Sequence, residues 1–226
     1  MSVYNGERFI VQTIESILDQ TFKNFELIIV DDHSTDKTAS LIAAFNDFRI
    51  KVIKNNKNIG LTKSLNIAIG HAEGEFIARI DADDIAYALR LERQVEYLEK
   101  NLEFAMCGTW ADIIDIESKI IGEYKTPVTN KSIRKMIFFH NPFIHPSVMI
   151  RKKALIEIGL YNENLRYIQD YELWTRIIAT YQVANIPEKL LQYRVFKGNI
   201  TSRYGFKVRI IGLWVRGLAL KRLFLN

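Results

Sequence analysis

The sequence contains few of the features that cross-link a chain or anchor it in a membrane. Cys107 is the only cysteine among 226 residues, so the chain has no internal disulfide and no metal site built from several cysteines. No stretch of about 18 or more uncharged apolar residues is present, and this excludes a membrane-spanning helix. Internal repeats, low-complexity stretches and long linkers are also missing, so we expect a single globular domain.

Acidic residues are absent from Lys189 to the end of the chain. Nine of the 31 Lys and Arg residues lie in that stretch, so residues 1–188 carry 22 basic and 26 acidic side chains. The formal net charge of +5 therefore belongs to the C-terminal stretch, and the rest of the chain is mildly acidic. This distribution argues against a nucleic-acid-binding protein and indicates an anionic partner for the C-terminal stretch.

Apolar runs alternate with helical patterns through the first part of the chain. The expected strands are Met1–Tyr4, Phe25–Val30, Ile50–Ile53 and Phe76–Ile80, and the expected helices are Ile10–Leu18, Lys37–Phe45, Thr62–Ala72 and Arg90–Lys100. This alternation predicts an α/β fold with a mostly parallel central sheet flanked by helices. Ligands of such sheets bind at the carboxyl ends of the strands.

Three carboxylates, Asp81, Asp83 and Asp84, follow the predicted strand Phe76–Ile80 directly. They repel one another and are costly to bury without a partner. One interpretation is a site for a hard divalent cation that also holds a diphosphate, and the other is a solvated acidic turn. These residues alone favour the turn. The pair Asp31-Asp32 also follows a predicted strand of the same sheet, and this convergence favours a functional site.

Several stretches, in the right order over roughly residues 1–200, resemble family 2 glycosyltransferases. They are Val3–Glu7, Gln20–Asp36, Asn58–Leu61, Gly74–Asp84, His145–Met149, Gln169–Trp174 and Gln192–Arg194. The resemblance implies a GT-A (Rossmann-like) domain at residues 1–200, an inverting mechanism, a nucleotide-diphosphate sugar donor and Mn²⁺ or Mg²⁺. The Gln-x-x-Arg-Trp motif of processive relatives is missing, because Val195 and Phe196 follow Arg194. We therefore expect one sugar to be transferred per acceptor.

The resemblance also implies which residues bind the nucleotide sugar. Asp32 is expected to accept a hydrogen bond from the nucleotide base, and Tyr4 and Glu7 are expected to line the nucleotide pocket. Lys63 is a candidate contact to a phosphate or to the base, with a solvated lysine as an equal alternative. Asp81 is expected to lie toward the ribose or the water shell of the metal. Asp31 is expected to hold its own loop.

Metal binding and proton transfer are assigned to two other carboxylates. Asp83 is the expected metal ligand, with all the carboxylates ionised at pH 7, while Asp84 is expected to serve the fold. Asp170 is the expected catalytic base, and it can at the same time cap a helix that starts at Tyr171. Its neighbour Glu172 is expected at the surface. His145 is left open between a residue that supports the active site and a purely structural one.

The first predicted strand is short. Relatives usually carry a longer apolar strand before Val3, so we expect uncovered apolar faces and unpaired backbone groups beside residues 1–4. This departure leads us to expect the true start of the protein upstream of Met1. Mass spectrometry of the native N-terminus tests that expectation.

Residues 201–226 are predicted to form a basic, apolar helical tail. At 100° per residue, Arg203, Lys207, Lys221 and Arg222 fall within an arc of about 100°, while Arg209 and Arg216 fall nearly opposite. Peripheral contact with an anionic membrane surface is the favoured interpretation. The alternatives are a tail packed on the domain and the remnant of a longer acceptor domain. The expected location is cytoplasmic, with this tail at the cytoplasmic face of the membrane.

The sequence thus predicts a metal-dependent hexosyltransferase of cell-surface polysaccharide synthesis. The favoured donor is a UDP-sugar, the acceptor is a hydroxyl of a glycan or a lipid-linked glycan, and no nucleic acid is involved. An inactive nucleotide-sugar-binding scaffold is one alternative, because the first strand is short. A sugar nucleotidyltransferase is a weaker one, since the turn Asn5–Arg8 lacks the Gly-rich loop with Arg and Lys of such enzymes.

Overall fold

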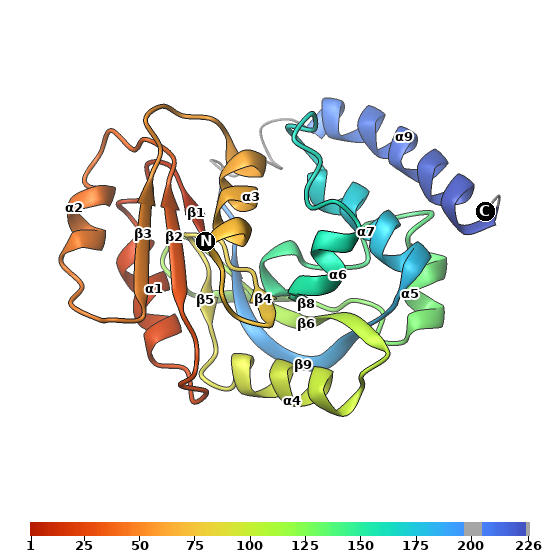
Figure 1. Ribbon diagram of the computed structural model, residues 1–226, viewed down its shortest axis with the longest axis horizontal. Helices are drawn as coiled ribbons and strands as arrows, with labels where there is room; N and C mark the ends of the chain where they lie inside the picture. Colours follow the sequence, from red (N-terminus) through yellow and green to blue (C-terminus); the bar gives the residue numbers. More distant parts are fainter. Residues whose placement is uncertain (197–204, 225–226) are drawn as a thin grey trace.

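Two β-sheets lie side by side with helices packed around them (Figure 1). The computed structural model describes residues 1–196 and 205–224, and side chains within 1–196 and 212–223. The smaller sheet is parallel, in the order β1 (Ser2–Val3), β2 (Leu27–Asp31), β3 (Ile50–Lys54). The larger sheet runs β4 (Phe76–Ala78), β8 (Met149–Arg151), β6 (Phe104–Ile114), β9 (Gln182–Arg194), β5 (Ile85–Ala86), and β7 (Ile120–Tyr124) pairs with β6.

The helices confirm the expected alternation with the strands in the first part of the chain. They are α1 (Ile10–Leu18), α2 (Thr38–Ala43), α3 (Leu61–His71), α4 (Arg90–Lys100), α5 (Asn130–Met136), α6 (Lys152–Glu157), α7 (Gln169–Thr180) and α9 (Gly205–Phe224). A 3-10 turn, η1, covers His145–Ser147. In Figure 1, α4 lies below the larger sheet, while α5, α6 and α7 lie above it. An α/β fold with a parallel sheet and flanking helices is therefore confirmed.

Strand β2 is buried along its whole length, as its continuous apolar sequence predicts. Leu27 and Ile29 pack in one cluster with Ile10 and Ile14 of α1. Ile28 and Val30 pack against Ala68 of α3. Helices therefore cover both faces of the smaller sheet, and this arrangement brings the loops that follow β1 and β2 to one edge.

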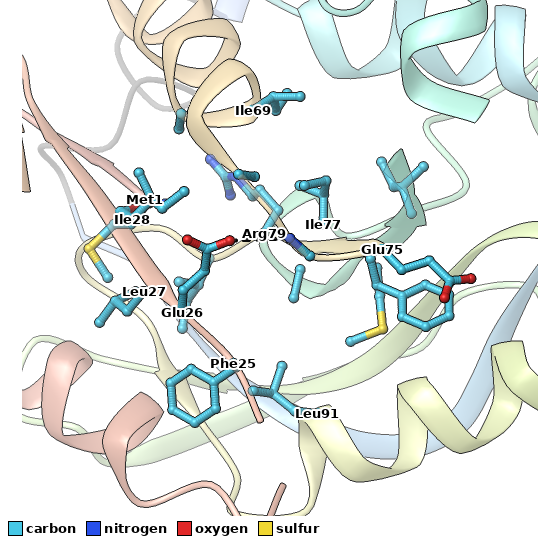
Figure 2. A pocket seen from close by; sticks show the side chains of 18 of the residues that line it. Met1, Phe25, Glu26, Leu27, Ile28, Ile69, Glu75, Ile77, Arg79 and Leu91 are labelled. Atoms are coloured by element: carbon cyan, nitrogen blue, oxygen red, sulfur yellow. Dashed lines mark hydrogen bonds between the residues drawn. The ribbon is translucent and has the colours of Figure 1, made fainter. Parts of the chain in front are cut away.

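The sheet differs from the expected arrangement in one respect, because it is divided. Strand β4 pairs antiparallel with β8 and does not continue the parallel sheet from β1. A cavity of about 580 Å³ lies between the two sheets, with Met1 and Ile28 on one side and Ile77 on the other (Figure 2). Apolar side chains of β2, α3 and β4 line this cavity. The Met1 ammonium donates to the Ile28 carbonyl at 2.9 Å, and burial with the charge of Arg79 lowers its pKa to about 5.

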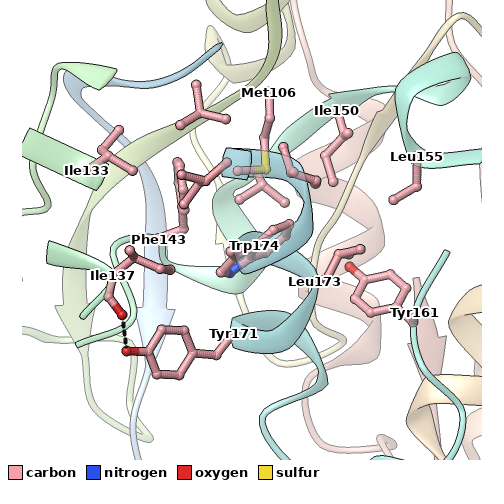
Figure 3. Packing of buried hydrophobic residues seen from close by; sticks show 14 of the residues in the cluster. Met106, Ile133, Ile137, Phe143, Ile150, Leu155, Tyr161, Tyr171, Leu173 and Trp174 are labelled. Carbon is pink, nitrogen blue, oxygen red and sulfur yellow. Dashed lines mark hydrogen bonds between the residues drawn. The ribbon is translucent and has the colours of Figure 1, made fainter. Parts of the chain in front are cut away.

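The largest core cluster surrounds α7 (Figure 3). Trp174 is fully buried, as its helical spacing with Ile177 and Ile178 predicts, and its ring centroid lies 5.6 Å from that of Phe143. The Tyr171 hydroxyl donates to the Ile137 carbonyl at 2.5 Å. These contacts fix α7 on the larger sheet, and the first turn of α7 carries the predicted base.

Helix α9 packs on α7. Val215 and Ala219 are fully buried in the same core cluster. Arg222 donates to Glu172 at 3.0 Å, and Arg176 donates to the same carboxylate at 2.8 Å. The expectation that Glu172 lies at the surface is therefore wrong: it is 2% exposed, because two arginines neutralise it in the α7–α9 interface.

The packing of α9 matches one alternative for the predicted tail, but part of the helix still faces solvent. Leu213, Trp214 and Leu220 are 50–65% exposed. Arg203 and the side chain of Lys207, half of the predicted basic arc, lie outside the described residues. Within the part of the chain that the structure describes, no helix is both long and apolar enough to cross a membrane.

Candidate active site

The acidic segment between β4 and β5 forms a compact cluster. One oxygen from each of Asp81, Asp83 and Asp84 lies within 4.8 Å of the others. The hydroxyl of Thr13, on α1, donates to the carbonyl of Asp84 at 2.8 Å and also contacts the carbonyl of Ala82 at 3.0 Å. These bonds hold the segment in a tight turn, so the three carboxylates converge.

The three carboxylates have different partners. Asp81 is paired with both terminal nitrogens of the buried Arg79 guanidinium. Asp84 is 1% exposed, and its Oδ1 accepts from the backbone N–H of Arg194 at 2.8 Å. Asp84 therefore holds the end of β9 against the cluster and serves the fold. Asp83 is the least constrained of the three and lines a cavity of about 1140 Å³.

Burial makes the charged forms of two of these carboxylates unfavourable. Burial, and secondly the charge of Asp81, raise the pKa of Asp83 to about 7, and burial with both neighbouring charges raises the pKa of Asp84 well above its usual value. The expectation that all these carboxylates are ionised at pH 7 is wrong for the cation-free protein. Asp84 Oδ2 is also buried without a hydrogen-bond partner among the described residues. A compact cluster of carboxylate oxygens fits a hard divalent cation such as Mg²⁺ or Mn²⁺.

Asp170 lines the same cavity as Asp81 and Asp83. Burial raises its pKa, and the Asn141 side-chain amide donates to its Oδ2 at 2.6 Å. Asp170 is not the N-cap that we expected, because α7 begins at Gln169 and places it within the first helical turn. The cap position is held by Ile168, whose φ of 50° is rare for a β-branched residue. Backbone strain thus sits directly beside the candidate base.

His145 lies at the wall of the same cavity. It lines the cavity, its Nε2 hydrogen-bonds the Tyr161 hydroxyl at 2.8 Å, and its ring lies against Trp174. Burial and the charge of Arg79 lower the pKa of His145 well below its usual value. The imidazole is therefore neutral at pH 7, and its role stays open between support of the site and structure alone.

Two of the predicted nucleotide-binding residues lie on the loop after β1. Tyr4 is 50% exposed. The Glu7 carboxylate accepts from the backbone N–H of Lys37 at 2.9 Å, and the Glu7 N–H donates to Asp36 at 3.1 Å. These bonds tie the loop after β1 to the loop after β2. Together the two loops form a wall at the carboxyl edge of the parallel sheet.

The other two nucleotide-side candidates lie farther along this edge. Asp32 is 2% exposed and accepts hydrogen bonds from Ile59 N, Gly60 N and the Asn55 side chain at 2.8–2.9 Å. Lys63 is exposed in the first turn of α3. Asp31 holds its own loop, as expected, by accepting from Ser34 N at 2.9 Å. Tyr4, Glu7, Asp32 and Lys63 do not line the cavity that joins Asp83 to Asp170.

Sequence reasoning did not identify three residues of this site. Arg79 carried a signal, because it is a basic residue in an otherwise apolar strand beside an acidic cluster. Asn141 lies 29 residues from its partner Asp170, and no local pattern connects them. Arg216 also lines the cavity, from α9, and its docking on α7 could not be derived from the helical pattern.

Comparisons with known proteins identify the family of this chain. A family model described as "Glycosyl transferase family 2" matches residues 1–159. A Haemophilus influenzae protein named "Uncharacterized glycosyltransferase" is 39% identical over 210 residues, which are 88% of this chain and 65% of that protein. The Escherichia coli O-antigen biosynthesis glycosyltransferase WbnJ is 33% identical over 200 residues, which are 86% of this chain and 78% of that protein. This chain therefore spans slightly less than two thirds of the Haemophilus protein.

A solved structure shares the fold. Staphylococcus aureus TarS, residues 1–349 in complex with UDP-GlcNAc, aligns with a TM-score of 0.76 at 20% sequence identity. The alignment covers 100% of this chain and 70% of that one. At this level of identity the likeness shows the fold alone.

Proposed function

The chain belongs to glycosyl transferase family 2, and from this premise we propose that it is an inverting, metal-dependent glycosyltransferase that moves one sugar from a UDP-sugar to a hydroxyl. The observation that carries the proposal is that Asp83 and Asp170, from distant parts of the chain, line one cavity. Asp83 belongs to a carboxylate cluster that suits a cation. Asp170 lies outside that cluster, and this separation is required of a base that acts on the acceptor.

The residues that line the cavity have different proposed roles. Asp83 would hold Mn²⁺ or Mg²⁺, with Asp81 toward the ribose or the water shell of the cation, and the cation when bound would supply positive charge at the departing diphosphate. Asp170 takes the proton of the acceptor hydroxyl while the hydroxyl oxygen bonds to the anomeric carbon and the bond to the diphosphate breaks. Burial favours this role, because a raised pKa makes the Asp170 carboxylate a stronger base. Tyr4, Glu7, Asp32 and Lys63 are proposed to contact the nucleotide at the neighbouring edge of the parallel sheet.

The names of related proteins support the choice of substrates. The E. coli relative is named for O-antigen biosynthesis, and TarS was solved with UDP-GlcNAc. These names support a UDP-sugar donor and a glycan or lipid-linked acceptor in the synthesis of a cell-surface polysaccharide. The nucleotidyltransferase alternative has no support from the relatives.

UDP together with Mn²⁺ is expected to raise the melting temperature more than either alone. A ligand present at 100 times its Kd adds about 2.7 kcal/mol to the free energy of unfolding, which corresponds to roughly 5–10 °C for a chain of this size. A thermal-shift series with UDP, GDP and CMP, each with and without Mn²⁺, measures it. Equal shifts with all three nucleotides, or no shift with any, would contradict a UDP-sugar donor.

Donor hydrolysis then separates an enzyme from a scaffold. Water replaces the acceptor in this assay, so no knowledge of the acceptor is needed. If the protein binds UDP with Mn²⁺ but neither hydrolyses nor transfers any UDP-sugar, the inactive nucleotide-sugar-binding protein is the correct assignment.

We also propose that the exposed side of α9 contacts an anionic membrane surface, at the cytoplasmic face where a lipid-linked acceptor is available. Trp214 and Leu220 are 50% and 51% exposed on this side, and Lys221 lies between them on the helix surface. An amphipathic surface of this composition binds at the headgroup boundary without spanning the bilayer.

The Trp214→Ser/Leu220→Ser variant is expected to bind vesicles at least about tenfold more weakly than the wild type, since each buried large apolar side chain contributes roughly 1.5–3 kcal/mol. Flotation with phosphatidylcholine vesicles, with and without phosphatidylglycerol, measures binding. Phe48→Ser is the matched control, because Phe48 is 95% exposed between α2 and β3. Equal flotation of both variants and the wild type would rule out membrane contact through α9.

A further inference from the structure

The part of the large cavity around α7 carries positive side chains that the proposed chemistry does not use. Arg166, on the segment that leads into α7, is exposed, and its guanidinium lies 5.9 Å from the centre of the Tyr167 ring. Arg216 reaches the same cavity from α9. Neither forms a salt bridge with a described residue, in contrast to Arg79, which is paired with Asp81.

Arg216 is held in place by the docking of its helix. Val215 beside it and Ala219 one turn later are fully buried against α7, so the Arg216 side chain leaves the interface toward the cavity. Its guanidinium hydrogen-bonds the Tyr171 hydroxyl, and this bond, together with the charge of Arg216, opposes the rise in the Tyr171 pKa that burial causes. The Nε of Arg216 is buried without a hydrogen-bond partner among the described residues. A buried donor of this kind is satisfied by an acceptor group that enters the cavity.

The position of the two arginines indicates which substrate they meet. Arg166 precedes Asp170 by four residues, and Arg216 lies beside Tyr171, the residue after Asp170. The cation-binding carboxylates, in contrast, lie on the segment between β4 and β5. In an inverting transfer the acceptor hydroxyl lies at the base, on the side of the sugar opposite the diphosphate. Groups that flank Asp170 therefore face the acceptor.

We propose that the acceptor is an anion, and that a phosphate ester or a sugar carboxylate next to its reacting hydroxyl binds Arg216 and Arg166. This inference rests on the proposed function, because Asp170 defines the acceptor side. Guanidinium groups bind both kinds of oxyanion through paired, charge-assisted hydrogen bonds. The first turn of α7 adds the positive end of the helix dipole to the same region.

The test measures phosphate binding by calorimetry on protein whose donor side is saturated with UDP and Mg²⁺. Arg216→Gln and Arg166→Gln are each expected to weaken the binding of inorganic phosphate about tenfold, the loss typical of one charge-assisted contact. Arg216→Lys keeps the charge and is expected to retain most of the affinity. Arg93→Gln is the control, because Arg93 lies on α4, outside the cavity. Equal affinity in the wild type and both Gln variants, or no binding by the wild type, overturns the proposal.

Three sugar probes then distinguish the source of the charge. Glucose 1-phosphate, glucuronate and methyl glucoside are titrated under the same conditions. Tighter binding of the phosphate indicates a phosphate-bearing acceptor, and tighter binding of glucuronate indicates an acidic sugar. A neutral glycoside that binds as well as both anions overturns the proposal.

Failure of this inference can be told apart from failure of the proposed function. If the wild type hydrolyses a UDP-sugar but binds phosphate no better than Arg216→Gln, only the anionic acceptor is wrong. If phosphate binds through Arg216 while no donor is hydrolysed, the anion site stands and the transferase assignment fails.

Discussion

Replacement of Asp170 by Asn is expected to reduce sugar transfer by about 10²–10⁴-fold and to leave the UDP–Mn²⁺ thermal shift unchanged, because a general base contributes a factor of this size. The amide has nearly the same shape as the carboxylate and still accepts the hydrogen bond from Asn141. It cannot, however, take a proton from the acceptor hydroxyl. Initial rates of UDP release with and without acceptor, compared with the wild type, measure the effect.

Glu163→Gln is a suitable control for this variant. Glu163 is an exposed carboxylate on the segment before α7, and it accepts from the Asn66 side chain outside the cavity. The substitution removes a negative charge near α7 and is expected to leave transfer within about twofold of the wild type, as is usual for a surface change. An Asp170→Asn protein that keeps a third of the wild-type rate would show that another group accepts the proton.

The pH profile of transfer gives a second readout for Asp170. Burial raises the pKa of this carboxyl above its usual value, and the basic form is the deprotonated one. Transfer should therefore fall as the pH drops through the raised pKa and level off above it. The residual activity of Asp170→Asn should not show this fall at low pH.

Several elements of the fold could be predicted from the sequence, because their signals are local. The apolar run at residues 27–30 predicts a strand buried on both faces, and the structure places it between α1 and α3. The spacing of Trp174 with Ile177 and Ile178 predicts the buried side of α7. In each case the residues that decide the outcome lie within one strand or one or two helical turns.

The rest depends on contacts between distant segments, which local patterns do not encode. Asp84 binds the backbone of Arg194, 110 residues later, and this contact decides that Asp84 serves the fold. Glu172 is buried because α9 supplies Arg222 from 50 residues away, although its i+4 partner Arg176 was visible in the sequence. The pairing of β4 with β8 is likewise long-range, so the division of the sheet could not be predicted.

The raised pKa of Asp83 also could not be predicted from local patterns, because it depends on burial in the folded protein. This pKa connects stability with function. Burial and the charge of Asp81 make the ionised form of Asp83 unfavourable in the cation-free protein. The ionised Asp83 carboxylate lowers the stability of the folded protein when no cation is bound. A cation that binds there removes this destabilisation. If Mg²⁺ or Mn²⁺ binds here, as we propose, part of its binding free energy comes from removing this destabilisation.

Asp83→Asn is accordingly expected to stabilise the cation-free protein while it abolishes activity. The folded-state pKa of Asp83, about 7, is above the usual value near 3.8, so the folded state binds more protons than the unfolded state between these values. The free energy of unfolding of the wild type therefore falls as the pH rises through this window. At pH 8 without metal the variant should gain about 1–2 kcal/mol over the wild type, a few degrees in Tm, and the gain should vanish near pH 4.

Addition of Mn²⁺ should reverse this order. The wild type is expected to gain stability from Mn²⁺ and UDP together, while the variant lacks a metal ligand and is expected to gain little. The variant is also expected to transfer sugar at least about 10³-fold more slowly, since a metal supplies several kcal/mol of charge stabilisation. For the wild type the Mn²⁺ affinity should fall about tenfold per pH unit below 7, because each cation bound then displaces a proton from Asp83. Asp19→Asn, at an exposed carboxylate that follows α1, should change neither profile. If Asp83→Asn remains active with Mn²⁺, or is less stable than the wild type at pH 8 without Mn²⁺, the cation lies elsewhere. If the variant is stabilised but inactive, Asp83 is a metal ligand whose charge lowers the stability of the cation-free fold.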